Sequence, residues 1–164
     1  MLYLNPGDKV ALIAPSYALA SGAEEETLEK ASTLLRSWGY EAVPYYDPSR
    51  EHKFAGMRFE GTTQQRAETL YTALSNPDIK AVMALRGGYG AVEVVLEIYN
   101  NPDKYPPLPA QQAKPVVGFS DITAIHLLLN QVWGWPSIHG EVITRLVKEN
   151  PDATTLAKTE SALK

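Results

Sequence analysis

Short apolar runs that recur between helix-like segments constrain the fold of this 164-residue chain more than any other feature. The runs are apolar on consecutive positions rather than alternate ones, which is typical of strands buried on both faces. We expect five strands, at residues 10–14, 40–45, 79–85, 115–119 and 137–140. Strands that alternate with helices predict an α/β fold, an open doubly wound parallel sheet with helices on both faces. This is a three-layer arrangement of the flavodoxin or Rossmann type.

Capping and stop signals mark the helices between these strands. Residues 21–24 (SGAE) have the form of a capping box, and so do residues 62–65 (TTQQ). Pro77 is expected to stop the second of these helices, because proline has no N–H to donate and its ring clashes with the preceding turn. Residues 47–56 show no period and are expected to form a loop.

Composition excludes several classes of function. Lys and Arg number 15 against 19 Asp and Glu, so the chain has no basic excess for a nucleic-acid partner. The absence of cysteine rules out disulfides, a thiol nucleophile and cysteine-ligated metal. No apolar run reaches the 18 or so residues that span a bilayer, so we expect no membrane partner. The first residues do not form a signal peptide, which favours a cytoplasmic protein.

A turn with three glycines, residues 86–90 (RGGYG), follows the third expected strand and precedes a helix. Glycine is needed where φ is positive or where the backbone approaches a ligand closely. The N–H groups at the start of the helix could therefore bind a phosphate or stabilise an oxyanion. The turn lacks the spacing of the dinucleotide or P-loop motifs. The alternative is a tight turn with no ligand.

A second turn, residues 118–121 (GFSD), also joins a strand to a helix. A small residue followed by a serine on a sharp turn is the first part of a nucleophile elbow. The usual glycine two positions after the serine is replaced by Ile122. The alternative is that Ser120 only caps the following helix, a common role for serine.

Five blocks occur in a fixed order along the chain: residues 7–16 (GDKVALIAPS), 54–56 (FAG) with Arg66, 86–90, 118–123 (GFSDIT) and 139–140 (HG). Together they resemble the LD-carboxypeptidase family of serine peptidases over essentially the whole chain. That family includes murein tetrapeptide carboxypeptidases and microcin-immunity hydrolases.

The resemblance implies a serine hydrolase that needs no metal or cofactor and releases the terminal D-alanine of murein tetrapeptides in cell-wall recycling. Ser120 matches the nucleophile, and the backbone N–H of Asp121 matches one oxyanion donor. A glycine of the 86–90 turn matches the other donor, with Gly88 favoured over Gly87.

The family's catalytic Glu and His lie in a C-terminal domain and cannot be assigned in this chain. We therefore expect residues 1–150 to form the N-terminal domain that carries the nucleophile. Residues 151–164 are expected to begin a linker or helix toward that second domain. A serine without a base is a poor nucleophile, so this chain alone should be inactive or nearly so. The family also implies a possible homodimer.

The three histidines are weaker candidates for the base. His126 follows Ser120 by six residues on a helix, about 9 Å along its axis, and lies beside an apolar stripe. It is interpreted as a core or partly buried histidine. His139 stands at a strand end and could border a pocket, where the family has a structural His-Gly. His52 lies in a polar stretch and is expected to be solvated.

Arg86 and Tyr89 flank the glycines of the first turn. A guanidinium there could hold a peptide carboxylate, and the alternative is a structural ion pair or stacking role. Two other functions stay open. One is hydrolysis of a microcin-like peptidyl-nucleotide. The other is a non-catalytic α/β module in which the glycine turn binds a small anionic ligand.

Overall fold

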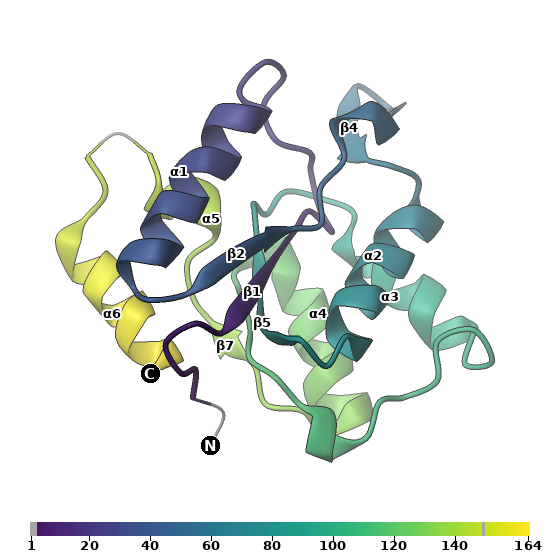
Figure 1. Cartoon of the computed structure of the whole chain (residues 1–164). Helices are drawn as coiled ribbons and strands as arrows, with labels where there is room; N and C mark the ends of the chain where they lie inside the picture. Colours follow the sequence, from purple (N-terminus) through teal and green to yellow (C-terminus); the bar gives the residue numbers. More distant parts are fainter. Residues whose placement is uncertain (1–2, 149) are drawn as a thin grey trace.

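A five-stranded parallel sheet forms the centre of the molecule. The computed structural model describes residues 3–148 and 150–164 (Figure 1). The sheet order is β2-β1-β5-β6-β7, and every neighbouring pair is parallel. These strands are β1 (Lys9–Ile13), β2 (Glu41–Pro44), β5 (Ile79–Ala84), β6 (Val116–Gly118) and β7 (Ile138–His139). The predicted doubly wound parallel sheet is confirmed.

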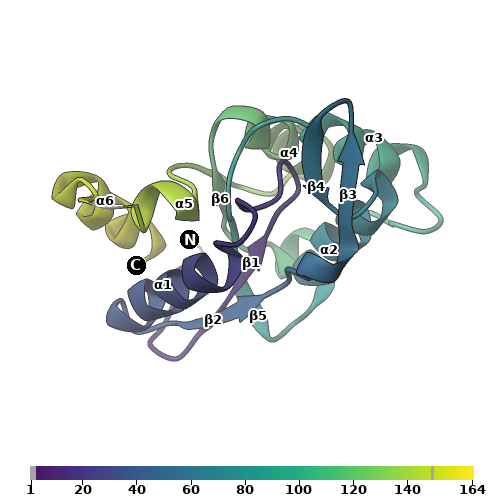
Figure 2. The same ribbon diagram turned by 90° about the horizontal axis from the view of Figure 1, so that it is seen from above.

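Helices cover both faces of the sheet (Figures 1 and 2). On one face lie α1 (Glu24–Ser37), α5 (Ile143–Leu146) and α6 (Ala153–Leu163). On the other lie α2 (Thr63–Ser75), α3 (Ala91–Asn100), α4 (Thr123–Leu127) and a π-helical segment (Leu128–Trp133). Short 3₁₀ turns lie between these elements, at Pro48–Arg50, Ala110–Gln112 and Ser120–Ile122. No helix in the described ranges combines the length and apolar character needed to cross a membrane.

The strands divide their side chains between two core clusters. In β1, Ala11 and Ile13 pack toward α2, α3 and α4, whereas Val10 and Leu12 pack toward α1, α5 and α6. All four are at most 1% exposed. Burying a large aliphatic side chain contributes about 1.5–3 kcal/mol, so these strands hold both helix layers in place.

The order in which strands are added to the sheet reverses between β1 and β5, although the strands themselves stay parallel. β2 lies on one side of β1, and the three later strands lie on the other. In open α/β sheets, ligands bind at the carboxyl ends of the strands beside such a switch point. The loops after β1, β5 and β6 meet at the carboxyl ends of the strands. We call this end of the sheet its carboxyl edge, and the opposite end its amino edge.

A two-stranded antiparallel hairpin, β3 (Glu51–Phe54) and β4 (Met57–Glu60), packs beside the carboxyl edge. The prediction of a loop over residues 47–56 was therefore wrong. Every residue of β3 is exposed, so its sequence lacks the apolar alternation that marks a strand. A bridge between Tyr17 and Phe59 and a hydrogen bond from Ala18 N to Arg58 O join the hairpin to the loop after β1.

The two predicted capping boxes had different outcomes. The box at 62–65 is present, with Thr62 and Gln65 bonded reciprocally. The box at 21–24 is not, because α1 begins at Glu24 with Ala23 as its uncapped N-cap residue. The Glu24 carboxylate instead lies 3.4 Å from Arg58 Nη2. The Glu24 side chain that the capping box required therefore forms an ion pair with Arg58 instead.

Candidate active site

Ser120 lies at the carboxyl end of β6 with φ of +61°, in the left-handed region. A residue with a side chain costs about 1–3 kcal/mol there, and such strain gathers at functional sites. The side chain is exposed. A strained, exposed serine between a strand and a helix is the geometry of a nucleophile elbow.

Ser120 does not act as a helix cap. Phe119 is the N-cap residue of the 3₁₀ turn, and Ile122 is that of α4, neither with a side-chain capping bond. No described residue forms a hydrogen bond with Ser120 Oγ. The helix-cap interpretation of Ser120 is therefore wrong.

Two glycines of the 86–90 turn are held close to other groups. A Cβ on Gly87 would lie 3.7 Å from Ser120 Oγ and 3.4 Å from Ser120 Cβ, so this backbone stands against the serine. Gly88 has φ of +130°, and a Cβ there would lie 2.2 Å from the Tyr17 ring. Only glycine fits at position 88, both for its backbone angle and for the space available.

The Asp121 carboxylate ties three loops together. Its Oδ2 atom accepts a hydrogen bond of 2.6 Å from Ser16 Oγ, in the loop after β1, and one of 2.9 Å from Ala91 N at the start of α3. A carboxylate at a helix N-terminus also interacts favourably with the helix dipole. The same residue therefore fixes the turn that carries Ser120 against the turn that carries the glycines.

Arg86 and Tyr89 have partners within the chain. Arg86 Nη1 donates a 3.1 Å hydrogen bond to Ala18 O, and its guanidinium lies 5.6 Å from the Tyr17 ring centroid. This is a cation–π contact, and Arg86 forms no salt bridge with a described carboxylate. The Tyr89 side chain is 48% exposed, and the neighbouring Glu93 carboxylate raises the pKa of its phenol.

Behind the glycine turn, the Arg66 guanidinium lies 4.4 Å from the Phe59 ring centroid, and Phe59 meets Tyr17 edge to face at 5.8 Å. A Cβ on Gly90 would lie 2.9 Å from the Phe59 ring. Arg66 is 3% exposed, and burial lowers the pKa of its guanidinium. Arg66, Phe59 and Tyr17 thus pack in a row between the hairpin and the glycine turn, and they support that turn.

The histidines lie as follows. His126 is 8% exposed, and its Nε2 atom lies 2.9 Å from Gly118 O, which confirms its interpretation as a buried histidine. His139 is exposed and borders a hollow of about 330 Å³ with Phe119, Glu141 and Lys158. His52 is exposed, as expected, but in strand β3.

Acidic and histidine side chains do not gather into a metal site within the described part of the chain.

Sequence reasoning gave no role to Ser16, Tyr17 or Phe59. Ser16 lies three residues after the end of β1 and is fully buried, and its hydroxyl donates to Asp121. Its place at the carboxyl end of a strand beside the switch point is a signal that the sequence does contain. Tyr17 and Phe59 carry no such signal, since their contact joins a loop to a hairpin that the sequence did not predict.

Comparison with known proteins agrees with these observations. Residues 10–140 match the family described as the LD-carboxypeptidase N-terminal domain. A murein tetrapeptide carboxypeptidase of Pseudomonas aeruginosa is 37% identical over 139 residues, which are 84% of this chain and 40% of that protein. A putative carboxypeptidase of Synechocystis sp. is 36% identical over 151 residues, which are 92% of this chain and 45% of that protein. The chain thus spans less than half the length of these relatives.

Solved structures show the same fold. A muramoyltetrapeptide carboxypeptidase from Oxalobacter formigenes superposes with a TM-score of 0.70 at 27% identity, over 94% of this chain and 47% of that one. An MccF-like protein from Bacillus anthracis superposes with a TM-score of 0.80 at 22% identity, over 99% of this chain and 46% of that one. The second likeness concerns the fold alone. From its sequence match over residues 10–140 and its fold, this chain belongs to the LD-carboxypeptidase family and corresponds to its N-terminal domain.

Proposed function

We propose that this chain is the nucleophile domain of a serine-type carboxypeptidase that releases the terminal D-alanine of murein tetrapeptides, in the cytoplasmic recycling of cell-wall peptides. The observation that carries the proposal is the conformation of Ser120. It is exposed, held at φ of +61° and placed beside Gly87 at the carboxyl edge of the sheet. The murein tetrapeptide carboxypeptidase of P. aeruginosa, at 37% identity, supports the substrate class.

In the proposed reaction, Ser120 Oγ attacks the carbonyl carbon of the terminal peptide bond and gives its proton to a general base. The oxyanion is held by the N–H of Asp121 and by that of Gly88, with Gly87 as the second choice. Losing one such donor typically costs about 10²–10³ in rate. Collapse of the tetrahedral intermediate expels D-alanine, which takes up a proton, and leaves an ester on Ser120. Water then hydrolyses the ester.

The base is proposed to be a His oriented by a Glu, both from a C-terminal domain. Two observations support this. No described side chain bonds to Ser120 Oγ, and the buried His126 already engages Gly118 O. The 164-residue chain by itself is then expected to have little or no activity, since a serine hydroxyl is almost wholly protonated at neutral pH. A homodimer is also proposed, from the family alone.

The test compares Ser120→Ala with the unaltered protein, in the form that its gene encodes, on a murein tetrapeptide. Released D-alanine is measured by mass spectrometry. We expect Ser120→Ala to lower the rate by about 10³-fold or more, because the nucleophile is lost. Ser75→Ala, a hydroxyl at the end of α2 that bonds to Thr72 O, is the matched control and should leave the rate unchanged.

Equal rates for Ser120→Ala and the unaltered protein would overturn the mechanism. A second arm uses a microcin-like peptidyl-nucleotide substrate. Hydrolysis of that substrate alone, lost in Ser120→Ala, would retain the serine mechanism but replace the murein peptide with the microcin class. Binding of either compound without turnover would favour the non-catalytic module.

A further inference from the structure

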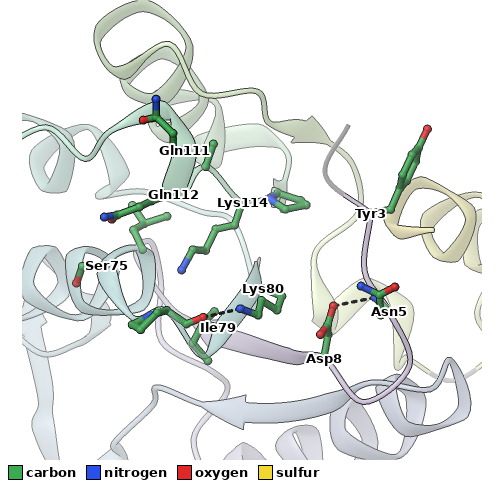
Figure 3. Close-up of a pocket in the computed structure, with 13 residues that line it drawn as sticks. Tyr3, Asn5, Asp8, Ser75, Ile79, Lys80, Gln111, Gln112 and Lys114 are labelled. Carbon is green, nitrogen blue, oxygen red and sulfur yellow. Dashed lines mark hydrogen bonds between the residues drawn. The ribbon is translucent and has the colours of Figure 1, made fainter.

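A second cavity, of about 490 Å³, is shown in Figure 3. It lies at the amino ends of the strands, whereas Ser120 lies at their carboxyl ends. It is bounded by the start of β5, the end of α2, the residues that precede β1 and the loop that leads into β6. The proposed hydrolysis uses no group at this edge. Its polar lining includes Lys114, Lys80, Gln111, Gln112 and Asp8.

Lys114 is a buried cation on this cavity, at 6% exposure. Its Nζ atom donates to Asn76 O at 2.6 Å and to Ala73 O at 3.4 Å, at the end of α2. An ammonium group has three donors, so one remains for a ligand. In Figure 3 the side chain projects into the hollow between Gln112 and Lys80.

Lys80 brings a second positive charge to the same space. Its Nζ atom donates to Pro77 O at 2.7 Å. Neither lysine forms a salt bridge with any described carboxylate. Asp8 lines the cavity too, but its Oδ2 atom accepts a 2.7 Å bond from Asn5 N. Burial, and then the charge of Lys80, lower the pKa of Lys114 to about 8.

A purely structural role accounts for only part of this arrangement. Lys114 satisfies carbonyls at the end of α2, which a helix C-terminus needs. That role does not require a second ammonium nearby, and like charges in one hollow repel each other. An anion bound between the two would remove the repulsion and use the remaining donors. Gln111 and Gln112 offer neutral amide donors at the rim.

We propose that this cavity is a second ligand site, which binds a small dianion of the phosphate-ester class between Lys114 and Lys80. Charge-assisted hydrogen bonds from both ammonium groups hold the phosphate oxygens. The ligand bridges the end of α2 and the loop before β6, at the edge away from the serine. The proposal does not depend on the hydrolase function.

The test is an NMR titration of the ¹⁵N-labelled chain with glycerol phosphate at constant ionic strength. We expect shifts confined to residues 74–80 and 111–114. Lys80→Gln should weaken binding about tenfold or more, since the variant loses one charged donor to the phosphate. Lys80 is exposed, so the variant should fold. Lys53→Gln, an exposed lysine of the hairpin, should bind as the unaltered chain does.

The pH dependence provides a second readout. The phosphate ester is a dianion at pH 7.5 and at pH 9.5, because its second pKa is about 6. Lys114 loses its proton between these values, so the affinity should fall about tenfold. Lys80, Asp8 and Tyr3 are the other ionisable groups that line the cavity. Absence of local shifts, or equal affinity for Lys80→Gln and the unaltered chain, would overturn the proposal.

Discussion

The two edges of the central sheet are built on different principles. At the carboxyl edge the backbone is strained at Ser120 and takes a positive φ at Gly88, and carboxylate and aromatic side chains hold it in place. At the amino edge, two lysines line one hollow, and neither forms a salt bridge with a described carboxylate. The first edge offers fixed backbone donors and a serine, and the second offers charge. The proposed catalysis and the proposed anion binding thus lie at opposite ends of the strands.

The largest expected effect that distinguishes the edges comes from Gly88→Ala. A Cβ at this position would lie 2.2 Å from the Tyr17 ring at a φ of +130°. We expect a loss of about 3 kcal/mol in the free energy of unfolding, from the backbone angle and from overpacking together. Urea denaturation measures it.

Gly39→Ala is the matched control at the amino edge. Its φ is +92°, but the nearest atom to a Cβ would be Pro6 Cβ at 3.9 Å. This variant should lose only about 1–2 kcal/mol, the cost of the backbone angle. Equal losses for the two variants would mean that crowding against Tyr17 at position 88 does not lower the free energy of unfolding.

Asp121→Ala tests whether one carboxylate joins the loops of the carboxyl edge. The change leaves the buried Ser16 hydroxyl without its acceptor and removes the bond from Ala91 N. We expect a loss of about 2 kcal/mol in the free energy of unfolding. In the double variant Ser16→Ala/Asp121→Ala, the loss should be smaller than the sum of the single losses. Strict additivity would contradict the coupling.

Glu60 makes the hairpin beside the carboxyl edge sensitive to pH. Its side chain is 1% exposed, and burial raises the pKa of its carboxyl to about 7, against the opposing charge of Arg50. The folded state holds the proton more tightly than the unfolded chain. This contribution to stability is therefore complete below pH 4.5 and is lost as the pH rises through about 7.

Glu60→Gln should accordingly be more stable than the unaltered chain at pH 8, by about 1–2 kcal/mol, and should lose that advantage by pH 4.5. Chemical denaturation at the two pH values measures the difference. Glu68→Gln is the opposite case, since Lys104 lowers the pKa of that exposed carboxyl. It should cost stability at pH 8. A Glu60→Gln effect that is independent of pH would contradict the assigned titration.

The smallest expected effect is a gain from Ser120→Gly. Relief of the left-handed backbone should raise the free energy of unfolding by about 0.5–1 kcal/mol, after the greater entropy of unfolded glycine is deducted. Thermal unfolding at matched pH measures it. Ser137→Gly, where φ is not positive, should instead lower stability. A destabilised Ser120→Gly would show that Ser120 is not strained.

Sequence reasoning worked where one pattern dominates a segment. The apolar runs predicted β1, β5 and β6, because burial on both faces requires consecutive apolar residues. The two outer strands, β2 and β7, were also predicted, although they are partly exposed. The box at Thr62 was found because both of its bonds are local. The hairpin and the start of α1 were missed, since exposed strand residues and the Glu24–Arg58 contact leave no local signal.

The candidate site divides in the same way. The sequence pointed to Ser120 and to the glycines of residues 86–90, because a serine or glycine on a strand-to-helix turn is visible in a short stretch. It did not reveal that Gly87 faces the serine and Gly88 faces Tyr17. Those contacts join separate loops, and only packing decides which atoms meet.

The sequence by itself determined the layers of the fold, the family and the strand ends that carry chemistry, since these follow from local periodicity and turn residues. Only the tertiary structure decided that Ser16 and Asp121, 105 residues apart, share a hydrogen bond. It likewise brought Lys80 and Lys114 onto one cavity. Contacts between distant segments depend on how strands are ordered in the sheet. No short-range pattern in the chain specifies that order.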